Sequence, residues 1–73
     1  MVLGGRPPAV AYLPPDLRKQ LRDPGRPRAI KETLLRAAIS KIDADWERGV
    51  IIGLEYARKQ IYEAALRELD GGA

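Results

Sequence analysis

The prolines of this chain are confined to its first third. All six lie within residues 1–27, together with three of the seven glycines, and residues 28–73 contain no proline. Each proline removes a backbone hydrogen-bond donor and restricts the residue before it, so no long helix or strand is expected there. We therefore predict an extended arm over residues 1–27, interrupted by one short helix near residues 16–22, where Leu17 and Leu21 share a face.

Residues 28–69 have the four-residue period of helices. The first part of this stretch carries apolar residues at Ile30, Leu34, Ala38 and Ile42. Asp43 and Asp45 suit the acidic first turn of a new helix, so we place a turn near Asp43, with Gly49 as a second candidate break. A second helix then runs from Asp45 to Leu69. The residues predicted to pack the two helices together are Leu34, Ala38, Ile42, Val50, Leu54 and Ile61.

These patterns predict an all-α fold. It consists of a helical hairpin over residues 28–69, the extended, Pro-rich basic arm with its one short helix, and a disordered tail over residues 70–73. A chain of 73 residues has room for one small domain.

Two helices do not hide every apolar side chain of the hairpin. The residues that fall off the main apolar face are Ile51, Ile52, Tyr56, Tyr62 and Leu66. Either the arm covers them or a partner does. The apolar segment 9–13 has the same two alternatives, since it either tucks onto the domain's own core or lies on a partner as an added strand. Trp46 is interpreted as a core residue at the hairpin turn, with an interface anchor as the alternative.

Side chains for catalysis are nearly absent. The chain contains no Cys and no His, and its only hydroxyls besides those of its tyrosines belong to Thr33 and Ser40. Nucleophilic catalysis, general-base catalysis and zinc binding usually depend on those groups, so we expect no enzymatic activity, no metal and no cofactor. Carboxylate pairs such as Glu63 and Glu68 suit solvated helix faces. The composition therefore predicts a protein that acts by binding.

The charge of the chain is unevenly divided. Residues 1–31 carry seven basic and two acidic side chains, a balance of +5, and residues 32–73 carry six basic and eight acidic ones, a balance of −2, which together give the net charge of +3. A basic arm favours an anionic partner, either an acidic protein surface or nucleic-acid phosphates, or it only keeps the arm soluble. Aromatic residues are not interleaved with the cations, so base stacking is not expected. The residues predicted to bind a protein partner are Val10, Tyr12, Leu13, Arg18, Arg22, Arg26, Arg28 and Lys31.

Signals for a membrane or for secretion are not found in the sequence. No apolar stretch approaches the roughly 20 residues that span a bilayer. Gly4, Gly5, Pro7 and Pro8 stand where a signal peptide would have its apolar core. Because the lack of cysteine also suits a reducing compartment, we expect a cytoplasmic protein with no membrane partner.

Four features occur together in this chain: a length of 73 residues, an Arg-, Ala- and Pro-rich composition, Pro-interrupted basic segments at 18–22 and 26–28, and a helical remainder. In these features the chain resembles the very small regulators that lytic bacteriophages make to bind the RNA polymerase of the host bacterium. The resemblance implies binding near the RNA exit, hindrance of sigma-dependent initiation and readthrough of terminators. Two alternatives stay open: a small nucleic-acid-binding protein that contacts phosphates, and a homo-oligomeric helical hairpin with a structural role.

Overall fold

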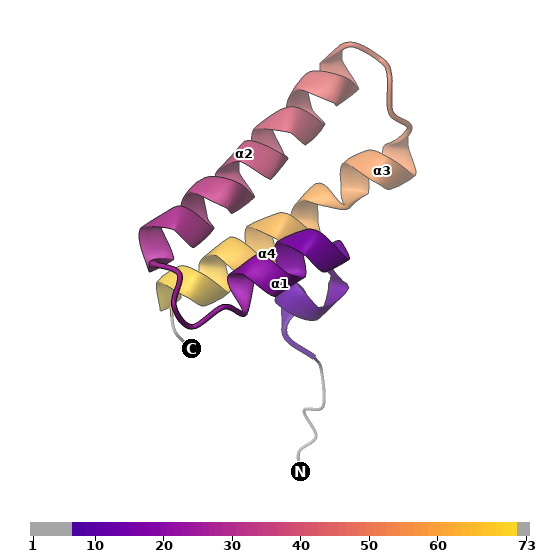
Figure 1. Ribbon diagram of the computed structural model, residues 1–73. Coiled ribbons are helices and arrows are strands. Elements are labelled where there is room, and N and C mark those ends of the chain that lie inside the picture. Colours follow the sequence, from indigo (N-terminus) through magenta and orange to yellow (C-terminus); the bar gives the residue numbers. More distant parts are fainter. Residues whose placement is uncertain (1–6, 72–73) are drawn as a thin grey trace.

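The computed structural model describes residues 7–71, which form helices joined by short turns (Figure 1). The elements are the 3-10 helix η1 (Ala9–Tyr12) and the α-helices α1 (Pro15–Leu21), α2 (Arg28–Glu47), α3 (Gly53–Ala57) and α4 (Lys59–Gly71). No strand is present in this part of the chain, so the all-α fold is confirmed. None of the described helices is long and apolar enough to cross a membrane.

The helices form a packed base and a projecting end. α2 and α4 lie side by side and run in opposite directions, while η1 packs on α4 and α1 packs on η1 and α2 (Figure 1). Leu13, Leu21, Leu35 and Ala65 make up the buried core of the base. Because these residues come from the arm, from α2 and from α4, the arm is part of the domain's own core. At the other end of the hairpin, α3 contacts only α2 and α4.

The N-terminal arm is not extended where the structure describes it, contrary to the prediction. Three of its prolines stand at the entrances of helices: Pro8 precedes η1, Pro15 is the first residue of α1, and Pro27 precedes α2. A proline in these positions removes no helical hydrogen bond, and its fixed φ suits helix entry. Leu13 is 3% exposed and Val10 packs against the core. This segment therefore tucks onto the core, which was the first of its two alternatives.

The hairpin turn lies at Gly49, and the predicted turn near Asp43 is wrong. Gly49 has a φ of 73°, in the left-handed region that residues with a Cβ rarely adopt. The Gly49 N–H donates to the Trp46 carbonyl and the Val50 N–H donates to the Asp45 carbonyl, each at 3.0 Å. This pair of bonds is the Schellman motif, which ends a helix by satisfying its last carbonyls. The glycine therefore decides the turn, and α2 continues past the acidic residues.

The predicted single helix from Asp45 to Leu69 is also wrong, because the chain after the turn forms two helices. At the start of α3, the Glu55 carboxylate accepts the Ile52 N–H at 3.1 Å, which is half of a capping box. α3 and α4 meet at Arg58, where hydrogen bonds span three residues instead of four. The second half of the hairpin therefore begins later and is bent, which changes the residues that it turns inward.

Two predicted core residues are exposed as a result. Val50, in the turn, is 62% exposed, and Leu54, on α3, is 80% exposed. Ile61 packs against the core, as predicted, and the half-buried residues on α2 include Leu34, Ala38 and Ile42. The fully buried residue of α2 is Leu35. The hydrophobic core therefore occupies the base of the hairpin and does not extend to its turn.

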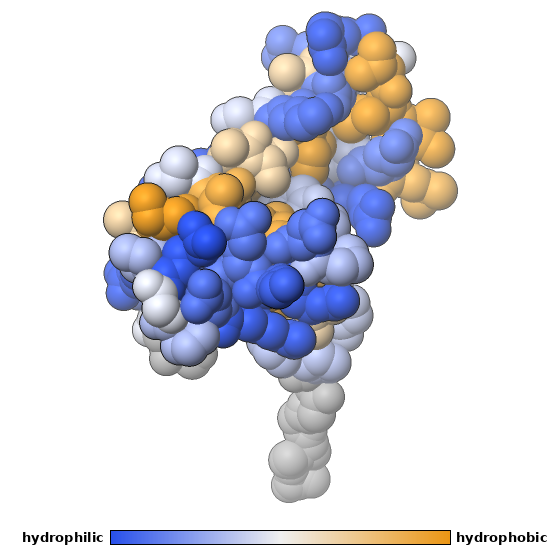
Figure 2. Space-filling model, viewed as in Figure 1, coloured by the Kyte–Doolittle hydropathy of each residue, from blue (hydrophilic) through white to orange (hydrophobic). Residues whose placement is uncertain are grey.

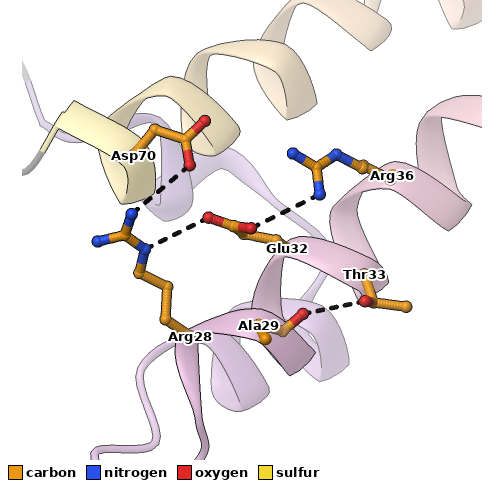
Figure 3. A network of polar contacts seen from close by, with 6 residues as sticks. All are labelled: Arg28, Ala29, Glu32, Thr33, Arg36 and Asp70. Atoms are coloured by element: carbon orange, nitrogen blue, oxygen red, sulfur yellow. Dashed lines mark hydrogen bonds and ion pairs between the residues drawn. The ribbon is translucent and has the colours of Figure 1, made fainter.

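One ion pair joins the start of α2 to the end of α4, and two more lie beside it within α2 (Figure 3). Arg28 Nε donates to Glu32 Oε2 at 3.3 Å, and Arg28 Nη2 lies 3.9 Å from Asp70 Oδ1. Arg36 Nη1 lies 3.5 Å from the other oxygen of Glu32. Asp70 therefore belongs to α4 and not to the predicted tail, of which residues 72–73 lie outside the described part of the chain.

Candidate binding surfaces

Exposed apolar residues gather at the turn end of the hairpin. Trp46 on the last turn of α2, Val50 and Ile52 in the turn, and Leu54 on α3 are 45, 62, 62 and 80% exposed. We call these four residues the apolar tip. Figure 2 shows hydrophobic surface at this end of the molecule, over α3 and the turn before it. Single exposed apolar residues are ordinary, but several together mark an interaction site.

An aromatic pair and a lysine hold α3 against α2 at the tip. The rings of Trp46 and Tyr56 stack with their centroids 4.7 Å apart, and Lys59 Nζ lies 5.4 Å from the centroid of Tyr56. Lys59 Nζ also donates to Asp43 Oδ1 at 2.8 Å, and this hydrogen bond raises the pKa of Lys59 above its ordinary value of 10.5. Trp46 is thus no core residue at the turn, because one side of it stacks and much of the rest is exposed.

The charged residues around the tip neutralise one another. Asp45, which is 9% exposed, accepts hydrogen bonds from Lys41 Nζ at 2.8 Å and from Arg48 Nη2 at 2.7 Å. The hydrogen bond from Lys41, and after it the one from Arg48, holds the pKa of Asp45 below its ordinary value of 3.8. Residues 41–59 contain four basic and four acidic side chains, so their net charge is zero. The tip therefore has no electrostatic preference for an anionic partner.

A second surface, the basic hollow, lies where α1 passes into α2. Its lining consists of Lys19, Gln20, Arg22, Asp23 and Arg26. The lining thus holds three cations and one carboxylate, that of Asp23, which accepts the Gly25 N–H at 2.9 Å. The Nε atom of Arg26 is buried and has no acceptor among the described residues, a condition that costs about 1–3 kcal/mol. Figure 2 shows hydrophilic surface over the face on which α1 lies.

The structure uses most of the predicted apolar anchors internally. Leu13 is buried in the domain's own core, so its assignment as a partner-binding residue is corrected. Val10 is half-buried and packs against the same core. Tyr12 alone of the three is exposed, at 55%. Of the three predicted apolar anchors, Tyr12 is therefore the one that a partner can reach.

The structure places the five predicted cations in three different settings. Arg18 Nη1 donates to the Ala11 carbonyl at 3.3 Å, and Arg28 pairs with carboxylates of α2 and α4, so both have internal acceptors. Arg22 and Arg26 come together in the basic hollow. Lys31 is half-buried on α2 and is not part of the lining of the hollow.

Sequence reasoning missed the apolar tip as a surface and Lys19 as part of the hollow. Val50 and Leu54 were assigned to a helix that begins only at Gly53. The available signal was Gly49 followed directly by three β-branched residues, since a helix-ending glycine places such a run in a turn. The sequence did indicate more apolar residues than two helices can bury. In the structure the arm covers those at the base of the hairpin, and those at its turn end stay exposed.

Within residues 7–71, no three His, Cys, Asp or Glu side chains gather where they could hold a metal ion. Comparisons of the chain with protein-family models, with curated proteins and with solved structures give no match. The two surfaces themselves therefore carry the functional interpretation.

Proposed function

We propose that the protein is a non-enzymatic regulator that binds another protein through its apolar tip. The supporting observation is the exposure of Val50, Ile52 and Leu54 within five consecutive residues at one end of the hairpin. Full burial of a side chain of this kind contributes about 1.5–3 kcal/mol, so covering the exposed fraction of all three contributes about 3–6 kcal/mol. Association itself costs about 4–15 kcal/mol, so the partner must also contact the rim around the tip.

The surroundings of the tip fit a protein partner better than a polyanion. Protein interfaces combine an apolar centre with a polar rim, and tryptophan is enriched among the residues that dominate their affinity. Trp46 lies at the tip, and the pairs that Asp45 forms with Lys41 and Arg48 lie beside it. Since the charges of this region sum to zero, affinity there depends on apolar burial and shape.

The partner that we propose is bacterial RNA polymerase. Its support is the resemblance of the chain, in length, composition and basic segments, to small phage-encoded regulators of that enzyme. The proposed action is regulation of transcription in the cytoplasm of a host bacterium, by hindering sigma-dependent initiation or by promoting readthrough of terminators. A small domain with one apolar end suits such a role, because it can cover a site on a large enzyme without chemistry of its own.

The test is the affinity of purified RNA polymerases from several bacteria for the protein and for variants of the tip. Ile52→Ser and Leu54→Ser should each weaken binding about tenfold or more, since a dominant interface residue contributes more than about 1.4 kcal/mol. Ile30→Ser is the matched control. Ile30 is also an exposed apolar residue, at 44%, but it lies at the opposite end of α2.

Three results would contradict the proposal. The first is the absence of polymerase binding, and the second is an equal loss for Ile30→Ser and Leu54→Ser. The third comes from sedimentation: if the wild-type protein is an oligomer that Leu54→Ser dissociates while polymerase affinity is unchanged, the tip is a self-association surface.

A further inference from the structure

We propose that the basic hollow binds phosphate groups of a nucleic-acid backbone. This inference goes beyond the protein contact proposed for the tip and does not depend on it. The hollow lies on α1 and the connection to α2, whereas the tip lies on α3 and the turn before it, and α1 and α3 do not touch. Both surfaces can therefore be occupied at the same time.

Among the described residues, the cations of the hollow have no carboxylate partner, unlike the five cations of the domain that form ion pairs. Lys41, Arg48 and Lys59 form ion pairs of 2.7–2.8 Å near the tip. Arg28 and Arg36 share Glu32 at the base. Among residues 7–71, by contrast, no ion pair or side-chain hydrogen bond engages the three cations of the hollow, which are Lys19, Arg22 and Arg26. Positive charge that the fold does not neutralise is available to an anion.

The shape and donors of the hollow suit a phosphate. The hollow has a volume of about 460 Å³ and is open to solvent, so a phosphate group can enter it without a change of fold. Three cations and Asp23 give its lining a net charge of +2. Arginine binds phosphate through two parallel N–H groups, and lysine adds a point charge.

The lining favours a nucleic-acid backbone over an acidic protein surface. The residues that line the hollow are all charged or polar, and its wall is formed largely by their aliphatic stems, so it lacks the aromatic and branched apolar side chains that dominate the affinity of protein interfaces. No aromatic residue lines it either, so bases have no stacking surface. The contact is therefore with backbone charge, and it carries no sequence information.

The test measures binding of the full chain to a short fluorescent oligouridylate and to a short DNA duplex as salt is varied. Three phosphate contacts predict that log K falls against log salt with a slope of about −2 to −3. Lys19→Gln and Arg22→Gln should each make this slope shallower by about 0.7–0.9 and weaken binding about tenfold at about 50 mM salt. Arg58→Gln is the matched control, because it removes the same charge from an exposed arginine beside α3.

The outcomes separate this inference from the proposed function. It is supported if Arg22→Gln weakens both probes, while Arg58→Gln and Leu54→Ser leave binding unchanged, whether or not the polymerase binds. It is overturned if neither probe binds at about 50 mM salt, or if Arg58→Gln weakens binding as much as Arg22→Gln. Loss of polymerase binding in Arg22→Gln without any nucleic-acid binding would assign the hollow to an acidic protein surface and would also overturn it.

Discussion

Truncation of two leucines of the hairpin is expected to change stability by very different amounts. Leu35 is fully buried on α2, whereas Leu54 is 80% exposed on α3. Leu35→Ala removes three carbon groups from the core, which costs about 2.4 kcal/mol at about 0.8 kcal/mol each, and the cavity left behind raises the cost to about 3–5 kcal/mol. Leu54→Ala removes the same atoms from the surface and should change stability by less than about 0.5 kcal/mol.

The size of the domain makes this difference easy to measure. A chain of 73 residues has a free energy of unfolding of about 4–11 kcal/mol. For a domain of this length, each kcal/mol lowers the Tm by about 4–8 °C, so Leu35→Ala should lose at least about 10 °C in thermal unfolding followed by far-UV circular dichroism. Equal Tm values for the two variants, or a larger loss for Leu54→Ala, would refute the placement of the core at the base of the hairpin.

Three further substitutions test the turn, the buried aspartate and the arm. Gly49→Ala places a Cβ in open space but at a φ of 73°, so it should cost about 1 kcal/mol from backbone strain alone, read from urea unfolding. The pKa of Asp45 is lowered, so its ion pairs stabilise the fold at neutral pH, and this stabilisation is lost as the pH falls below about 4. The urea midpoints of Asp45→Asn and of the wild type should therefore differ at neutral pH and converge in acid. Glu68 accepts the Ala9 N–H with both carboxylate oxygens, at 3.1 and 2.9 Å, so Glu68→Ala should cost about 1 kcal/mol and speed amide exchange in η1.

The fold class was predictable from the sequence because period and proline placement are local signals. The four-residue period that begins at residue 28 predicts a helix there, and the structure has α2 in this place. The short helix predicted near residues 16–22 is also present, as α1. The turn was misplaced because acidic residues and Gly49 gave competing signals. Asp45 sits in the last turn of α2, where a negative charge is unfavourable, and its two cationic neighbours offset that cost. Such compensation depends on side chains three and four residues away and is hard to weigh in advance.

The candidate surfaces were less predictable, because exposure depends on tertiary packing. Arg22 and Arg26 were recognised as binding residues from their charge, and the structure adds that they share a hollow with Lys19 and have no internal partner. Leu13 was expected to contact a partner and Leu54 to be buried, and the structure shows the reverse. Leu13 is buried because the arm packs on α4, and Leu54 is exposed because the second half of the hairpin begins later than expected. No periodicity in the sequence reveals either event.

The most direct test of the central claim compares the affinity of purified bacterial RNA polymerase for Leu54→Ala and for Tyr12→Ala. Both substitutions truncate an exposed apolar side chain, one at the tip and one on the arm. If the tip carries the contact, Leu54→Ala should weaken binding about tenfold or more and Tyr12→Ala should change it little. A loss confined to Tyr12→Ala, with Leu54→Ala equal to wild type, would contradict the claim and return the binding surface to the arm.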